Sequence, residues 1–128
     1  MKRHRNLQDL SREHHSALQL ALRAKRAATS GDQAIIKATA VACLTAFRTE
    51  LDPHFVVEET TLSPLLIAAR EDVLVAQLEG DHLALRDLCD QLQQPDTATL
   101  LAFAERLTAH VRFEERELFG VLERLMDA

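Results

Sequence analysis

The sequence contains two copies of a histidine followed four residues later by a glutamate, at His54 with Glu58 and at His110 with Glu114. A step of four residues places two side chains on the same face of an α-helix, so each pair can present an imidazole beside a carboxylate. These groups are good ligands for iron, zinc and manganese. The spacing alone is a weak signal, because a chain with 6 histidines easily contains one such pair by chance.

Both pairs belong to a longer internal repeat. The pattern F-x3-L-x2-H-x3-E-x3-L occurs twice, and each member of the second copy lies 56 positions after its counterpart. A second acid follows each glutamate directly, at Glu59 and Glu115. Two other segments show a weaker echo at a displacement of 68, which aligns His14 with His82 among regularly spaced apolar residues. Four apolar stripes therefore carry one histidine each.

The two repeated glutamates fall on the leucine-rich side of their segments, which is expected to face a core. A carboxylate is rarely buried there unless it is paired or binds a metal. Hydrogen bonds from neutral histidines could satisfy both glutamates without a metal. A metal centre accounts better for four imidazoles and two carboxylates, and six ligands exceed the four of a zinc site, which favours two metals that share the glutamates. The predicted ligands are His14, His54, Glu58, His82, His110 and Glu114.

The elements that must position these residues are expected to be helices. With only 3 Gly, 3 Pro and 5 aromatic residues, the composition favours an all-α fold. Turn-forming residues cluster in three places, at 29–32, 63–71 and 94–97. The four amphipathic helices predicted between them run from about 7 to 28, 33 to 62, 72 to 92 and 98 to 126. Short connections predict an up-down-up-down four-helix bundle, and we expect residues 1–128 to form a single domain.

Charge and hydropathy argue against several kinds of partner. The formal net charge of -5 and a pI near 5.6 predict no binding to nucleic acid or to an anionic membrane surface. No stretch approaches the ~18 apolar residues of a membrane span, and no signal-peptide pattern is present, so a cytoplasmic location is expected. Cys43 and Cys89 lie outside any CxxC motif and are expected to be reduced core residues.

Four stretches, in order, resemble the hemerythrin-like family, also called HHE cation-binding domains. They are LSREH at 10–14, HFVVEE at 54–59, DHLALR at 81–86 and HVRFEERELF at 110–119. The resemblance covers essentially the whole chain. It implies two non-haem irons joined by Glu58, Glu114 and an oxo or hydroxo bridge, with the four histidines as terminal ligands. It also implies an open coordination position for dioxygen or another small ligand.

The chain departs from the oxygen-carrying hemerythrins at two positions. Those proteins have a second histidine four residues after the one on the third helix, where this chain has Arg86. They also place the acid of the fourth helix five residues after its histidine, which here is Glu115. We select Glu114 because it shares an apolar stripe with Leu118, and we interpret Glu115 as part of a solvated face. The missing histidine argues against reversible oxygen carriage.

The sequence leaves three functions open. The leading hypothesis is a di-iron protein that binds or senses O2, NO or peroxide, or that buffers iron, and that is not an enzyme; manganese or zinc are the alternative metals. A di-iron peroxidase or oxidase is the second hypothesis, although the chain has no Tyr or Trp to carry a radical. The third is a metal-free helical interaction module. The sequence does not predict an oligomeric state.

Overall fold

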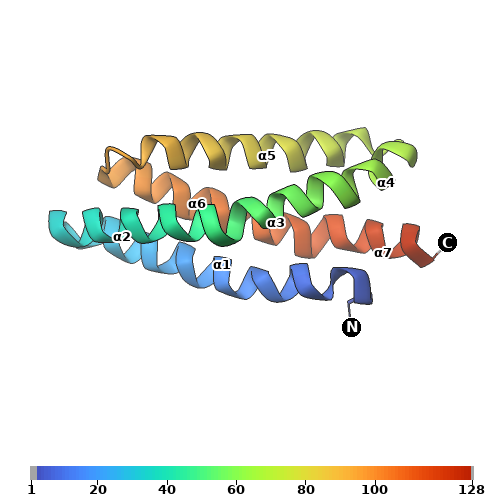
Figure 1. The fold of residues 1–128 in the computed structure, drawn as a ribbon, viewed down its shortest axis with the longest axis horizontal. Coiled ribbons are helices and arrows are strands. Elements are labelled where there is room, and N and C mark those ends of the chain that lie inside the picture. Colours follow the sequence, from blue (N-terminus) through green and yellow to red (C-terminus); the bar gives the residue numbers. More distant parts are fainter. Residues whose placement is uncertain (1–2, 128) are drawn as a thin grey trace.

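The computed structural model describes residues 3–127, which form four long helices joined by short turns (Figure 1). The first helix is α1 (Arg5–Ser30) and the third is α5 (Asp72–Gln91). The second comprises α2 (Gln33–Ala46), the π-helical turn η1 (Phe47–Leu51), α3 (Asp52–Val57), the π-helical turn η2 (Glu58–Leu62) and α4 (Ser63–Ala68). The fourth comprises α6 (Thr97–Phe113), the π-helical turn η3 (Glu114–Leu118) and α7 (Phe119–Asp127).

Consecutive long helices run in opposite directions, so both ends of the chain lie at the same end of the bundle (Figure 1). The first helix packs against α2 and α6, and α5 packs against α6. The prediction of an all-α, up-down-up-down four-helix bundle is thus confirmed. Among the helices of residues 3–127, none is both long enough and apolar enough to cross a membrane.

Helix ends are set by local capping groups. The carboxylate of Asp32 accepts hydrogen bonds from two backbone amides at the start of α2, and Asp96 accepts one at the start of α6. Gly31 follows α1 with a φ of 70°, a left-handed conformation that glycine adopts at little steric cost. These caps make the two turns at this end of the bundle short, which keeps neighbouring helices antiparallel.

The second helix extends further than the sequence predicts. An end near residue 62, ahead of Pro64, is wrong, because the helix continues as α4 to Ala68. The amide of Ser63 bonds to the carbonyl of Glu58, five residues back, so the backbone is already widened where Pro64 follows. The proline ring then has room, and its missing N–H interrupts no regular α-helical ladder. Pro53 follows η1 in the same way, and the helix continues through it.

The buried apolar residues form two clusters, and the predicted ligands lie between them. One cluster includes Leu92 and Phe103, and the other, nearer the chain ends, includes Leu66. Cys43 and Cys89 are free and buried in the first cluster. Burial raises the pKa of the Cys43 thiol to about 11 and that of Cys89 to about 12. Both thiols therefore stay protonated, as expected of core residues.

Candidate metal centre

The side chains of the six predicted ligands meet at the middle of the bundle. Each long helix contributes one histidine, and the two glutamates are the first residues of η2 and η3. All six are buried, with at most 5% of any residue exposed. They are His14, His54, His82, His110, Glu58 and Glu114. His15, next to His14, is exposed.

The two copies of the internal repeat also share a backbone conformation at their glutamates. Turns η2 and η3 begin at Glu58 and Glu114, which are equivalent residues of the repeat. A π-helical turn inserts one extra residue into a helix and re-aims the side chains around it, and such turns are frequent at functional sites. Gly120 follows η3 where Pro64 follows η2. The backbone is thus adjusted in the same way beneath both buried carboxylates.

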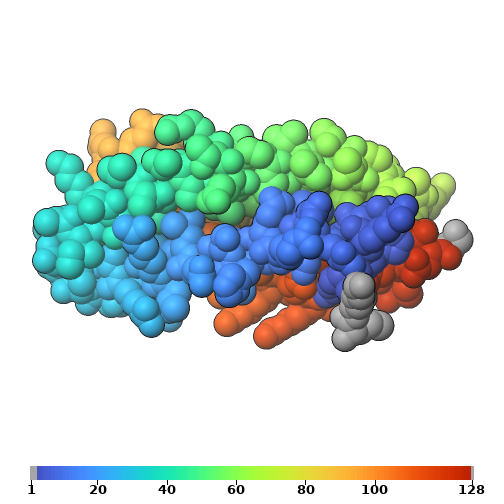
Figure 2. All heavy atoms as spheres, turned by 60° about the horizontal axis from the view of Figure 1, so that its bottom comes forward, coloured from blue at the N-terminus to red at the C-terminus, as the bar shows by residue number. Residues whose placement is uncertain are grey.

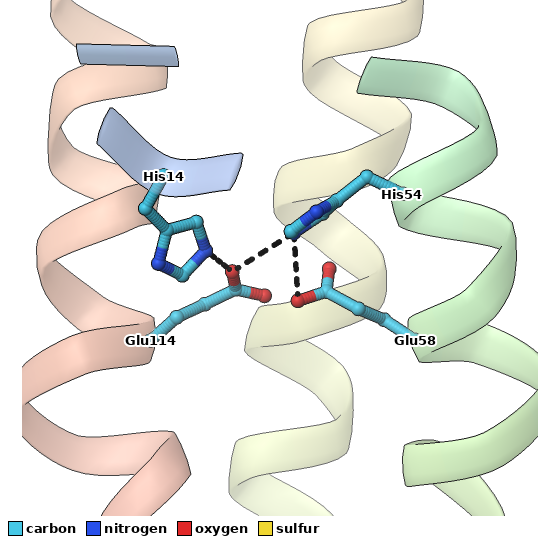
Figure 3. Close-up of side chains that lie close together, drawn as sticks. All are labelled: His14, His54, Glu58 and Glu114. Atoms are coloured by element: carbon cyan, nitrogen blue, oxygen red, sulfur yellow. Dashed lines mark hydrogen bonds and ion pairs between the residues drawn. The ribbon is translucent and has the colours of Figure 1, made fainter. Parts of the chain in front are cut away.

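One half of the site is drawn in Figure 3, where His14, His54, Glu58 and Glu114 point toward one another. The Nε2 atom of His14 lies 2.6 Å from Oε1 of Glu114. The Nε2 atom of His54 lies 3.2 Å from Oε2 of Glu58 and 3.7 Å from Oε1 of Glu114. Single donor atoms of the four residues all lie within 4.8 Å of one another, close enough to hold a metal ion.

The other half repeats this arrangement with His82 and His110. The Nε2 atom of His82 lies 2.9 Å from Oε1 of Glu58, and that of His110 lies 3.2 Å from Oε2 of Glu114. These four residues also offer donor atoms within 4.8 Å of one another. Both glutamates belong to both groups, so the arrangement has room for two ions that share the carboxylates.

Several buried polar atoms in this cluster make ion-pair contacts but no hydrogen bond of acceptable geometry. Within residues 3–127 these include Nε2 of His110, Oε2 of Glu58 and Oε2 of Glu114. An unsatisfied buried polar atom costs about 1–3 kcal/mol, and three of them together are unusual. A cation among them would satisfy all three at once. The residues present therefore fit a metal.

A second carboxylate lies behind each histidine, at the nitrogen that faces away from the site. Glu115 lies 2.6 Å from Nδ1 of His14, and Glu59 lies 2.6 Å from Nδ1 of His82. A carboxylate at this position accepts the Nδ1–H hydrogen bond of a neutral imidazole, which leaves the Nε2 lone pair free for a metal. Both acids are thus placed to orient the rings.

The remaining two histidines have the same kind of support. Asp81 lies 2.9 Å from Nδ1 of His110, and Glu13 lies 3.3 Å from Nδ1 of His54. Each acid directly precedes one histidine in the sequence but contacts a different one. Glu13 and Asp81 are separated by 68 positions, the displacement of the weaker repeat, so the repeat could have identified them.

The interpretation of Glu115 as part of a solvated face is wrong. Its side chain is only 30% exposed and accepts hydrogen bonds from Arg3 and from the hydroxyl of Ser11, in addition to its contact with His14. The sequence holds a signal for this role, because Glu115 repeats Glu59 at the displacement of 56. Arg3, by contrast, has no counterpart in the repeat and was not predicted.

A comparison with protein families gives an independent identification. The model of the family described as the hemerythrin HHE cation binding domain matches residues 5–122. The chain belongs to the hemerythrin family. Comparisons with curated proteins and with solved structures gave no match. The buried clusters and the family together identify a hemerythrin-like, cation-binding protein.

Arg86, which replaces a histidine of the oxygen-carrying hemerythrins, does not enter the cluster. Its guanidinium donates hydrogen bonds to Glu59, at 2.8 and 3.2 Å, and to Asp52 at 2.9 Å. Burial alone would raise the pKa of Glu59, but the hydrogen bonds from Arg86 and His82 lower it. Arg86 therefore holds Glu59 ionised behind the imidazole of His82.

Without a metal, the pKa values of several side chains in the hemerythrin cluster are raised, which favours their protonated forms. Burial acts to lower the pKa of His54, but its close contacts with Glu114 and Glu58 and their negative charges outweigh it and raise that pKa to about 10. Burial opposes protonation of His110 too, yet Glu114 and Asp81 raise its pKa to about 10. Burial and the charge of Glu114 raise the pKa of Glu58. A metal ion that binds here must displace such protons.

A cavity of about 190 Å³ reaches this site from one side. It lies where α1 adjoins the second helix, on the face shown in Figure 2. Apolar residues such as Leu20 and Leu107 form part of its wall, and the exposed residue Glu13 also lines it. His14, His54 and His110 line it, and His82 does not. The cavity therefore reaches both histidines of one half of the site but only His110 of the other.

Proposed function

We propose that this protein is a non-haem di-iron protein whose two ions share Glu58 and Glu114. One ion is held by His14 and His54, and the other by His82 and His110. The observation that carries the proposal is the pair of overlapping donor groups with both glutamates in common. Imidazole and carboxylate suit iron, although manganese and zinc accept the same donors. Bound iron supplies redox chemistry and an open position for a small ligand.

The proposed role is to bind or sense O2, NO or peroxide, or to buffer iron, without obligatory turnover. The chain's own residues support it in two ways. The carboxylates at Nδ1 hold the imidazoles in one orientation, and the apolar wall of the cavity favours small uncharged molecules over bulk water. The single domain and the cytoplasmic location stay predictions from the sequence.

A di-iron peroxidase or oxidase is the second candidate, and the cavity favours it. A volume of about 190 Å³ exceeds what a diatomic ligand needs, so an organic reductant could reach the site. The two functions differ in peroxide consumption at steady state. An enzyme consumes many equivalents in the presence of a reductant, whereas a binding protein reacts once per site and stops.

Metal content and the visible spectrum test the proposal directly. Protein purified from aerobic, iron-replete cells is expected to contain two irons per chain and to absorb in the near ultraviolet. The double variant His54→Ala, His110→Ala is expected to lose both signals, and the variant His15→Ala, which changes an exposed histidine, is expected to keep them. A colourless protein whose stability responds neither to iron nor to chelator would instead indicate the metal-free interaction module.

A further inference from the structure

The ligand set is nearly symmetric, but the support behind the four histidines is not. Three of the carboxylates at Nδ1 are themselves held by an arginine. These pairs are Glu115 with Arg3 at 3.3 Å, Glu59 with Arg86 at 2.8 Å and Asp81 with Arg106 at 3.0 Å. An acid held in this way has a defined position from which to orient its histidine.

Glu13, the acid behind His54, is the exception. Its side chain is 50% exposed, and its distance of 3.3 Å from His54 is the longest of the four. No lysine or arginine of residues 3–127 lies within ion-pair distance of it. A solvated carboxylate without a second partner restrains an imidazole only weakly. His54 is therefore the least firmly oriented of the four histidines.

Aromatic stacking holds His14 and His82 but not His54. The ring of His14 stacks on Phe119 with 5.3 Å between centroids, whereas His54 meets Phe55 at 6.1 Å in a T-shaped arrangement. The ring of His82 is fully buried and stacks on Phe55 with 4.0 Å between ring centroids. The rings of Phe55 and His110 form a T-shaped pair with 5.5 Å between centroids, and the guanidinium of Arg86 lies 5.8 Å from the Phe55 ring centroid. His82 cannot turn away from the site without disturbing this packing.

Release of a metal ion requires that a ligand turn away and that water or a chelator take its place. At His54 both steps are easy, because the cavity brings solvent to the ring and Glu13 holds it loosely. At His82 both steps are opposed by Phe55 and by the pair of Glu59 with Arg86. His110 also lines the cavity, but Asp81, which Arg106 holds, opposes rotation of its ring.

We infer that the two ions differ in lability: the ion at His14 and His54 exchanges with solution, while the ion at His82 and His110 stays in place. This inference rests on the proposed di-iron function. It assigns the protein, as an iron buffer, one exchangeable ion and one resident ion per chain. The difference arises from residues outside the ligand set, since each ion has two histidines and the same two glutamates.

Release kinetics test this inference. The full chain is loaded anaerobically with two equivalents of ferrous iron and mixed with an excess of a ferrous chelator that becomes coloured on binding. We expect two phases of equal amplitude whose rates differ at least tenfold. A single phase that releases both ions would overturn the inference. A chain that binds no iron would contradict the proposed function itself, before any release is measured.

Substitutions assign each phase to a position. Glu13→Gln is expected to accelerate the fast phase alone, and Arg86→Gln the slow phase alone, each by several-fold. Glu79→Gln and Arg116→Gln change an exposed acid and an exposed arginine and are expected to alter neither phase. Acceleration of the slow phase by Glu13→Gln, or of the fast phase by Arg86→Gln, contradicts the assignment.

Replacing one ligand at a time assigns the fast and slow ions to their positions in a second way, because each variant is expected to bind a single ion. The variant His54→Ala is expected to bind one ion and release it slowly, whereas His82→Ala is expected to bind one ion and release it quickly. The reverse order would overturn the inference. Should an alanine variant fail to fold, Glu13→Gln and Arg86→Gln, which lie outside the ligand set, still decide the question.

Discussion

Each histidine of the cluster has a carboxylate at both of its ring nitrogens. The inner nitrogen, Nε2, faces Glu58 or Glu114, and the outer nitrogen, Nδ1, faces an acid nearer the surface. The outer acid selects the tautomer whose Nε2 lone pair is free for a metal. The outer acids should therefore affect metal affinity although they touch no metal.

At the residue scale, we expect Asp81→Asn to lower metal affinity about tenfold to a hundredfold. Burial alone would raise the pKa of Asp81, but hydrogen bonds from His110 and Arg106 lower it, so the native group is ionised. An amide keeps the shape and loses the charge. A competition titration with a chelator measures the change, and Asp87→Asn, at an exposed acid of the same helix, serves as the control. Equal affinities in both variants would contradict the role of Asp81.

The histidines also predict how the metal-free protein responds to pH. The pKa values of His54 and His110 rise from 6.5 to about 10 on folding. A pKa raised by folding contributes stability that is complete below 6.5 and is lost as the pH rises through about 10. We expect the free energy of unfolding of the chelator-treated protein to fall steadily from pH 7 toward pH 10, as measured by urea denaturation. A flat profile would show that the cluster is not protonated.

At the scale of the elements, replacing a glycine inside a helix and replacing a glycine in a turn should change stability in opposite directions. A Cβ added at Gly80, within α5, would meet no atom within 4 Å, and Gly80 has no positive φ. We expect Gly80→Ala to raise the free energy of unfolding by about 0.5–1 kcal/mol, because alanine has less conformational entropy to lose. Gly31→Ala should lower it, since Gly31 has a φ of 70°. Thermal melts of both variants, compared with the parent, check the two opposite signs.

The three π-helical turns found in residues 3–127 explain how prolines fit inside long helices. In each turn one amide bonds to a carbonyl five residues back, and Pro53 and Pro64 come immediately after such an amide. Two of the turns also carry the buried glutamates, so the widened backbone both accepts a proline and aims a carboxylate inward. Gly120 shows that the turn forms without proline, because η3 precedes it in the same manner.

At the scale of the molecule, the polar cluster separates two apolar clusters of the core. A ligand that binds only the folded state stabilises it by about 2.7 kcal/mol at a hundred times its dissociation constant. We therefore expect chelator treatment to lower the melting temperature of the iron-loaded protein by roughly 5–15 °C. The double variant His54→Ala, His110→Ala should melt at the same temperature with and without chelator. A similar effect of chelator on both proteins would indicate metal binding elsewhere.

Much of this architecture could be predicted because the spacing of apolar residues in the sequence reflects the periodicity of an amphipathic helix. Apolar residues at three- and four-residue intervals predicted four helices, and the displacement of 56 predicted that Glu58 and Glu114 would be equivalent. His14 and His82 followed from the weaker repeat. These properties either belong to a single helix or recur in the sequence repeat, so they can be recognised from the sequence without a structure.

Only the tertiary structure shows which acid contacts which histidine and which acid Arg86 binds. It also shows why the two halves of the site differ. Glu13 precedes His14 in the chain but contacts His54, and Arg86 binds an acid 27 positions away. Such contacts depend on the rotation and axial register of separate helices. That register is set by packing across the whole core, which a pattern along one helix does not record.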